Sequence, residues 1–203
     1  IYPAKNKGPR FYRTLKESYG GEAELGLKHF LQAYLACIAF VDEQIGTVVD
    51  AVNNSEFKDN TIIVLVSDHG WQMGEKEYLF KNSPWEESTR IPYIIKTPEC
   101  KSGEKVNHPV SLIDIFPTLT DLCGLTGDNR KNEVGGNIGG FSLKPFLKNT
   151  KTKNWDGPNG ALTIVGNGLN QKEVLKQTYS YRTKDWRYIL YLDGSEELYH
   201  NKV

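Results

Sequence analysis

The segment that decides the fold runs from Ile62 to Gly70 and reads IIVLVSDHG. A continuous apolar run of this kind is typical of a strand buried on both faces, as in the parallel sheet of an α/β protein. Such sheets hold their ligands beyond the carboxyl ends of the strands. Asp68 and His69 lie at that end, and Gly70 allows a sharp turn after them. The segment therefore predicts a carboxylate and an imidazole, two metal-binding groups, at the edge of a sheet.

The same tripeptide also has a purely structural interpretation. An Asp-His-Gly sequence after a strand is often a turn with a helix cap, because Asp caps helices and Gly adopts left-handed conformations. Asp68, His69 and Gly70 alone do not decide between a turn and a metal site, so the choice depends on the rest of the chain.

The composition is that of a folded protein without charge bias. Lysine plus arginine equals aspartate plus glutamate, 25 of each in 203 residues, so we expect no nucleic-acid partner. The aromatic content of 11% is higher than in disordered chains. No apolar run approaches the roughly 18 residues of a membrane span. The length suits one large domain, or one and a half small ones.

The three cysteines, Cys37, Cys100 and Cys123, have no metal-type spacing, and their odd number leaves at least one unpaired within the chain. Cys37 lies within an apolar helical pattern, which predicts a small core residue. The chain opens with Ile1 rather than methionine, so we expect it to be part of a longer polypeptide. The lack of a signal peptide is then no evidence for a cytoplasmic location.

The first half of the chain predicts one helix and one strand of an α/β unit. Residues 1–26 are polar and glycine-punctuated, and we expect an irregular lead-in. A helix is predicted over 27–54, with a buried stripe that recurs every three or four residues. That stripe consists of Phe30, Tyr34, Ile38, Val41, Ile45, Val48 and Val52. A short turn leads to the strand at 61–67, which completes half of a βαβ unit.

The second half of the chain predicts a series of shorter elements. Residues 70–90 read as a loop or short helices, 91–95 as a strand restricted by Pro92, and 112–123 as a helix that Gly124 ends. The glycine-rich stretch at 126–140 is a candidate boundary. Beyond it, short strands at 178–181, 186–192 and 197–199 predict a small antiparallel sheet, with a hairpin turn at Asp193-Gly194.

The predicted fold class is therefore α/β, with part of a mostly parallel sheet flanked by helices and a small C-terminal antiparallel subdomain. We expect residues 1–140 to belong to the main domain and residues 141–203 to the subdomain.

Six segments in order resemble the sulfatase family of the alkaline-phosphatase-like superfamily. The resemblance covers roughly residues 23–125 and 178–200, well over half of the chain. Within the family the chain resembles the iduronate-sulfatase-like bacterial enzymes. The six segments are residues 34–46, 61–70, 74–82, 87–92, 111–119 and 188–199.

The resemblance implies hydrolysis of a sulfate ester. Such enzymes use a formylglycine, made from a cysteine in a Cys-x-Pro-Ser-x-Arg motif, whose hydrated aldehyde attacks sulfur. A divalent cation, usually calcium, binds the nucleophile and a sulfate oxygen. The expected substrate is a sulfated small molecule or glycan, and we expect the parent protein to be periplasmic or extracellular.

The family's functional residues map onto a few positions of this chain. Asp68 and His69 match a pair at the metal site, and Asp68 offers the carboxylate oxygen that a hard cation prefers. His69 either contacts the metal or hydrogen-bonds the nucleophile and sulfate. Lys81 matches the lysine that contacts sulfate, where an ammonium stabilises anionic oxygens. Trp71 and Glu75 are near enough in sequence to line the substrate pocket.

The chain also departs from the family pattern. None of Cys37, Cys100 and Cys123 is followed two residues later by proline, so the nucleophile motif is absent. The resemblance therefore implies the C-terminal part of a sulfatase. We expect this polypeptide alone to be inactive and to bind calcium weakly, since two ligands do not replace a full oxygen cage. We also expect exposed sheet edges to favour self-association.

Two other functions stay open. A phosphodiesterase or phosphonate hydrolase of the same superfamily shares the Asp-His pair, although Lys81 favours a sulfate ester because two-metal enzymes can use a second cation instead. A non-catalytic module that keeps the scaffold is the other alternative.

Overall fold

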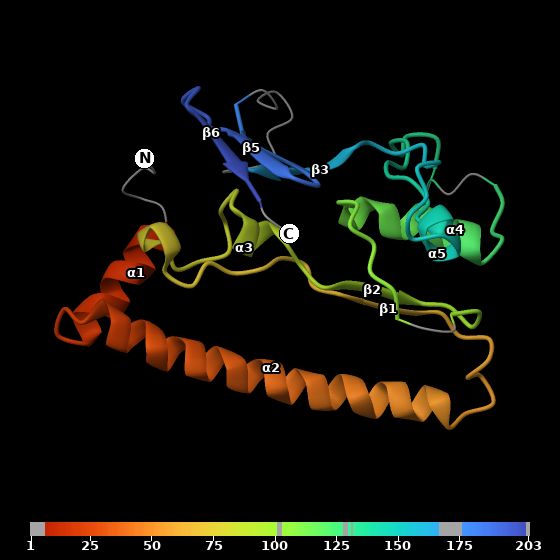
Figure 1. Cartoon of the computed structure of the whole chain (residues 1–203), viewed down its shortest axis with the longest axis horizontal. Helices are drawn as coiled ribbons and strands as arrows, with labels where there is room; N and C mark the ends of the chain where they lie inside the picture. The colour runs from red at the N-terminus through yellow and green to blue at the C-terminus, as the bar shows by residue number, and fades with distance from the viewer. Residues whose placement is uncertain (1–6, 101–102, 128–129, 131, 167–175, 202–203) are drawn as a thin grey trace. The chain divides into compact units, whose positions relative to one another are not determined.

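A computed structural model describes residues 7–100, 103–127, 130, 132–166 and 176–201. The chain forms two compact units, Ile1–Glu99 and Cys100–Val203 (Figure 1). The predicted boundary at residue 140 concerns the domains of the whole protein and stays a prediction. No helix formed by the described residues is both long and apolar enough to cross a membrane.

The first unit begins with two helices, α1 (Lys7–Ser18) and α2 (Ala23–Asn53). The expectation of an irregular lead-in is wrong from Lys7 onward, and residues 1–6 lie outside the described part. Pro9 stands in the first turn of α1, where its missing amide hydrogen costs no helical bond. The predicted helix over 27–54 is confirmed, with a start four residues earlier.

The predicted burial of the α2 stripe is largely wrong for the described chain. Val41 is 52% exposed and Val48 is 64% exposed, and Tyr34 and Ile38 are exposed as well. Phe30, near the start of the helix, is partly covered and stacks on Trp71. The stripe has the right period, but the described residues supply no layer that covers its full length.

The strand at the centre of the sequence argument forms β1 (Ile63–Val66). It pairs antiparallel with β2 (Tyr93–Lys96), with Val64 opposite Ile95. The predicted parallel sheet is therefore not seen among the described residues, and β1 is half-buried instead of buried on both faces. Parallel neighbours need a crossover connection, whereas the loop after β1 brings the chain straight back as an antiparallel partner.

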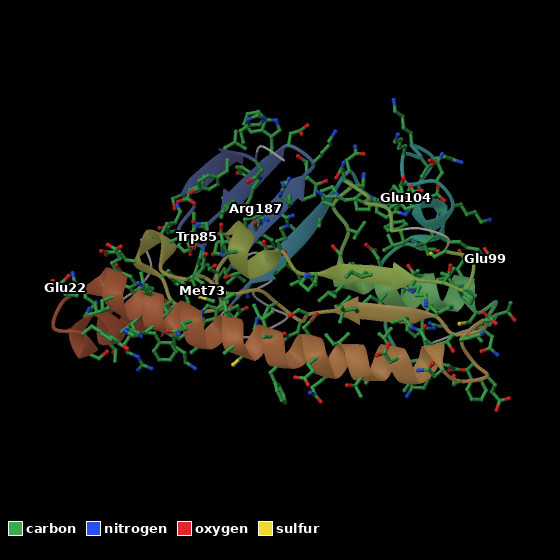
Figure 2. All side chains as sticks on the ribbon, turned by 60° about the horizontal axis from the view of Figure 1, so that its bottom comes forward. Glu22, Met73, Trp85, Glu99, Glu104 and Arg187 are labelled. Atoms are coloured by element: carbon green, nitrogen blue, oxygen red, sulfur yellow. The ribbon has the colours of Figure 1, made fainter. Side chains whose placement is uncertain are left out.

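Between β1 and β2 the chain forms the segment that we call the site loop, residues 70–90. It contains a 3-10 turn, η1 (Glu75–Glu77), and a short helix, α3 (Glu86–Thr89), in agreement with the predicted loop with short helices. α2 lies along the β1–β2 pair in Figure 1 and in Figure 2. Lys96 of β2 donates a hydrogen bond to Asn53 at the end of α2.

The second unit contains η2 (Leu112–Asp114), α4 (Ile115–Leu122) and α5 (Lys144–Lys148). The helix predicted over 112–123 is confirmed in these two pieces, and α5 was not predicted. Buried Asp114 ties the region together, since its carboxylate accepts the backbone N–H groups of Ser111 at 2.8 Å and Phe141 at 2.9 Å.

The unit ends in a four-stranded antiparallel sheet of β3 (Gly160–Val165), β4 (Thr178–Thr183), β5 (Trp186–Leu190) and β6 (Glu196–His200). The predicted small antiparallel sheet is confirmed, with β3 as a strand that the sequence analysis missed. Gly194 has φ 82°, and the Tyr191 N–H donates to the Ser195 carbonyl, so the predicted Asp-Gly turn closes the β5–β6 hairpin.

Candidate functional site

The end of β1 brings Asp68 and His69 together. The Asp68 side chain is 82% exposed, and its Oδ1 accepts the His69 backbone N–H at 3.0 Å. Its other oxygen, Oδ2, lies 3.2 Å from His69 Nε2. The predicted Asp68–His69 pair therefore places an exposed carboxylate next to an imidazole at the end of the strand.

The other imidazole nitrogen fixes the tautomer of His69. Nδ1 lies 2.9 Å from the Gly70 carbonyl oxygen, which can only accept a hydrogen bond, so Nδ1 carries the proton in the neutral ring. Nε2 then presents a lone pair toward Asp68 Oδ2. Two electron-rich atoms at this distance are stabilised by a positive charge, either a proton on Nε2 or a bound cation.

Asp68 and His69 thus fit one edge of a divalent-cation site. No group of three or more histidine, cysteine, aspartate or glutamate side chains within the described ranges could hold a metal ion. A hard cation such as calcium takes about six to eight oxygen ligands. Its remaining ligands would come from water, substrate, carbonyl oxygens or residues outside those ranges.

The backbone after His69 is clamped to α3. Gly70 N–H donates to the Ser88 carbonyl at 2.9 Å, and Trp71 N–H donates to the Glu87 carbonyl at 2.8 Å. A Cβ on residue 70 would lie 2.0 Å from the Glu87 carbonyl oxygen. Glycine is therefore required at this position by a close backbone approach, and the approach holds the strand end against α3.

Aromatic side chains of the site loop and of α1 pack against one another as an aromatic cluster. The Trp71 ring packs edge-on against Phe80, with centroids 5.5 Å apart, and Phe11 of α1 contacts Phe80 in the same way at 5.4 Å. Tyr78 is buried and packs edge-on against the buried Trp85. Figure 2 labels Trp85 and Met73, both on this loop. Aromatic pairs of this geometry stabilise by about 0.5–1.5 kcal/mol beyond their burial.

The predicted pocket residues Trp71 and Glu75 serve the loop itself in the described structure. Trp71 belongs to the aromatic cluster, while Glu75 Oε2 accepts the Met73 backbone N–H at 2.8 Å. Trp85 is buried, and Arg90 Nη1 lies 3.9 Å from Glu86 Oε1, so both residues take part in the structure of the loop. Contact of Trp71 or Glu75 with a substrate stays a prediction.

Lys81 directly follows Phe80, and its side chain is exposed. No hydrogen bond or ion pair joins it to Asp68 or His69 in the part of the chain that the structure describes. The structure thus brings Asp68 and His69 together and places Lys81 next to the anchored Phe80 within the site loop. Convergence of all three on one anion stays a prediction.

Sequence reasoning missed Gln72, which is buried between the carboxylates of Glu75 and Glu87. Nothing in the local pattern marks a single glutamine as buried, because the contact with Glu87 depends on how α3 folds back. It also missed the packing of α1 on the loop, where Leu79 N–H donates to the Gly8 carbonyl.

Comparisons with known proteins identify the family of the chain. A family model described as Sulfatase matches residues 2–125, and one described as N-sulphoglucosamine sulphohydrolase, C-terminal, matches residues 74–202. The first match covers more than half of the chain.

The chain belongs to the sulfatase family.

Curated relatives support the same assignment. A protein named sulfatase from Formosa agariphila is 38% identical over 174 residues, which is 86% of this chain and 31% of the relative. Human arylsulfatase K is 31% identical over 177 residues, which is 85% of this chain and 31% of the relative. The chain therefore spans about a third of the length of these curated relatives, and it corresponds to the C-terminal portion of the family.

Solved structures of similar fold include catalytic proteins. One was determined in complex with its substrate D-glucosamine-2-N,6-O-disulfate, with TM-score 0.67 and 27% identity over 93% of this chain and 38% of that chain. A phosphonate monoester hydrolase from Silicibacter pomeroyi has TM-score 0.63 and 25% identity over 79% of this chain and 32% of that one. These relatives bear the names sulfatase and arylsulfatase K, so the closer resemblance to the iduronate-sulfatase-like enzymes stays a prediction.

Proposed function

We propose that the protein carrying this chain is a sulfuric ester hydrolase. Asp68 and His69 contribute two ligands to its divalent-cation site, and Lys81 contacts the sulfate group. The observation that carries the proposal is the geometry at the end of β1. There Nδ1 of His69 is tied to a carbonyl, and Nε2 and the Asp68 carboxylate face a common point. Such a pair is suited to bind a cation next to an anionic group.

The cation is calcium in this proposal, because an exposed carboxylate is the better ligand of the pair for a hard ion. When bound, it would act as a Lewis acid on a sulfate oxygen and on the nucleophile. The chain's own contribution is orientation. The Gly70 carbonyl holds the His69 ring, and the backbone clamp to α3 holds Gly70 in turn. The formylglycine belongs to the family-level proposal and to residues other than the described ones.

Lys81 supplies a mobile ammonium to the same anion. The aromatic cluster anchors Phe80, so the neighbouring backbone at Lys81 is fixed while its side chain stays free to reach sulfate. A cation on an anchored part of the loop stabilises negative charge that grows on the leaving oxygen.

We propose a sulfated sugar as the substrate class. The support is the structural neighbour that was solved with a disulfated glucosamine as its substrate. Trp71 and Glu75 are the pocket residues of this proposal. A relationship to iduronate-sulfatase-like enzymes and a periplasmic or extracellular location are parts of the same proposal, and cell fractionation tests the location.

The test is hydrolysis of 4-methylumbelliferyl sulfate by the full-length protein, with Asp68→Asn compared with Asp59→Asn, an exposed aspartate in the turn before β1. We expect kcat/KM to fall by at least about 100-fold for Asp68→Asn, because a metal ligand is lost, and to stay within about twofold for the control. Chelation should abolish activity and calcium should restore it. Full activity of Asp68→Asn would refute the proposed cation site.

A phosphonate monoester hydrolase is the second candidate, favoured by the similarity to the Silicibacter pomeroyi enzyme. Assay of the same preparation with phenyl phosphonate separates the two. Faster turnover of the phosphonate than of the sulfate ester would support the second candidate, and no turnover of either would support a non-catalytic module.

A further inference from the structure

The amide of Gln72 occupies an unusual place in the site loop. Gln72 is 1% exposed, and one terminal atom of its side-chain amide lies 3.2 Å from Glu75 Oε2 and 3.1 Å from Glu87 Oε2. A carboxylate only accepts hydrogen bonds, so the amide is oriented with its nitrogen toward both glutamates. Each of the two amide hydrogens then has one anionic acceptor, and such charge-assisted bonds are the strong ones.

These three side chains come from three separate segments of the loop. Gln72 follows the strand-end clamp, Glu75 begins η1, and Glu87 lies in α3. The backbone N–H of Gln72 also donates to the Phe80 carbonyl at 3.2 Å. Residue 72 therefore connects the segment before η1 with the segment that leads to Lys81, and it joins both to α3, the helix that holds Gly70.

The charges around Gln72 explain why a neutral donor is needed. The acceptors of the amide nitrogen are the side chains of Glu75 and Glu87, both acidic. Two carboxylates drawn to one point repel each other unless donors lie between them. An amide provides two hydrogens without adding charge, which no acidic or apolar side chain of similar size does.

We propose that Gln72 is a positioning residue for the sulfate-binding loop. Its amide bridges Glu75 and Glu87. This bridge holds Lys81 and the Gly70 carbonyl in the positions that the proposed reaction requires, and the Gly70 carbonyl in turn orients His69. This inference rests on the proposed sulfatase function, because Lys81 and His69 are the groups that it positions.

The key variant is Gln72→Glu, which places a third carboxylate at the same point. Near neutral pH it should repel Glu75 and Glu87, and we expect kcat/KM with 4-methylumbelliferyl sulfate to fall about 10- to 100-fold, as when partners of metal ligands are lost. Two neighbouring carboxylates raise the pKa of the new glutamate, so as the pH falls it binds a proton and again donates one hydrogen bond, where the amide donated two. The ratio of variant to wild-type activity should therefore recover in part as the pH falls.

Two further variants separate positioning from a simple loss of folding. Gln72→Leu offers no donor at any pH, so its loss should not recover at low pH. Gln44→Glu makes the same substitution on the exposed part of α2 and should match the wild type throughout. In Gln72→Glu/Glu87→Gln the new amide can donate to residue 72, so the loss near neutral pH should shrink.

Hydrogen–deuterium exchange of the full-length protein gives a readout that needs no activity. In Gln72→Glu, peptides covering residues 70–81 should exchange faster near neutral pH and return toward the wild-type pattern at about pH 5, after correction for intrinsic rates. If the protein has no sulfatase activity but this exchange pattern appears, the function fails and the bridge stands. Activity and exchange profiles of Gln72→Glu that run parallel to the wild type, or a variant unfolded at every pH, would overturn the inference.

Discussion

The site loop and α2 belong to the same compact unit but are packed in opposite ways. In the loop, Tyr78 is 1% exposed, and Leu79, Ser83 and Trp85 are buried as well. Along α2, a helix of 31 residues, the only buried residue is Gly26, and Phe40 is 64% exposed. The loop has little regular secondary structure, yet it is the better packed of the two regions.

The two regions differ in whether the described chain supplies residues that pack against them. The loop packs on α1 and on itself, through Phe11, Phe80, Tyr78 and Trp85. The α2 stripe needs a long apolar surface, and the described residues give it only a few contacts near its start. The loop is therefore a self-supported site, while α2 presents an apolar face of the kind that marks an interaction surface.

The largest effect should come from Tyr78→Ala in the site loop. The substitution removes a buried ring, its edge-on contact with Trp85 and its hydrogen bond to the Asn82 carbonyl. We expect the free energy of unfolding of the first unit to fall by about 3–5 kcal/mol. Urea unfolding followed by tryptophan fluorescence measures it. The matched change on α2, Phe40→Ala, should alter stability by less than about 0.5 kcal/mol, and equal losses in both variants would remove the contrast between the regions.

Elements with local signals were predictable from the sequence. The period of α2 and the Asp-Gly turn before β6 identified a helix and a hairpin correctly. α1 was missed because residues 1–26 are polar and interrupted by glycine and proline, although proline is tolerated in a first turn. β1 was identified as a strand, but its antiparallel partner was not. An apolar run indicates that a strand is buried, and it does not indicate which element packs against it.

The candidate site shows the same limit. Asp68 and His69 are neighbours in sequence, so their proximity could be predicted, and the role of the Gly70 carbonyl could not. The bridge from Gln72 to Glu87 depends on a chain reversal through α3, which no local pattern encodes. The sequence thus identified Asp68 and His69 as candidate ligands, and the structure identified the Gly70 carbonyl and Gln72 as groups that position the site.

A pair of glycines sharpens the contrast between buried and open surfaces. A Cβ on Gly8 would lie 2.2 Å from the Tyr78 ring, whereas a Cβ on Gly46 in α2 would meet nothing within 4 Å. We expect Gly8→Ala to destabilise by about 1–3 kcal/mol through overpacking. Gly46→Ala should stabilise by about 0.5–1 kcal/mol, because alanine favours the helix. Thermal unfolding of both variants checks the signs, and a destabilising Gly46→Ala would mean that this face is covered.

The exposed α2 stripe predicts self-association of the chain. Val41 and Val48 lie seven residues apart on one face of the helix, and both are exposed. Replacing both by lysine should weaken self-association by about tenfold or more, because apolar area no longer becomes buried. Sedimentation velocity over a concentration series measures this. The control, Ala36→Lys/Ala39→Lys, adds the same charge on the opposite face and should leave association unchanged. If the control dissociates equally, charge rather than the stripe governs the contact.

The smallest expected effect concerns the tip of the site loop. Lys76 and Glu77 have φ of 56° and 55°, in the left-handed region that costs an ordinary residue roughly 1–2 kcal/mol. Glycine adopts this region freely but loses more conformational entropy on folding, so Glu77→Gly should stabilise by no more than about 1 kcal/mol. Thermal unfolding measures the change, with Glu43→Gly on α2 as a control that should destabilise by about 1 kcal/mol. Because the turn bond from Glu77 N–H to the Gly74 carbonyl persists in the variant, a clear loss of stability would show that the Glu77 side chain itself supports the loop.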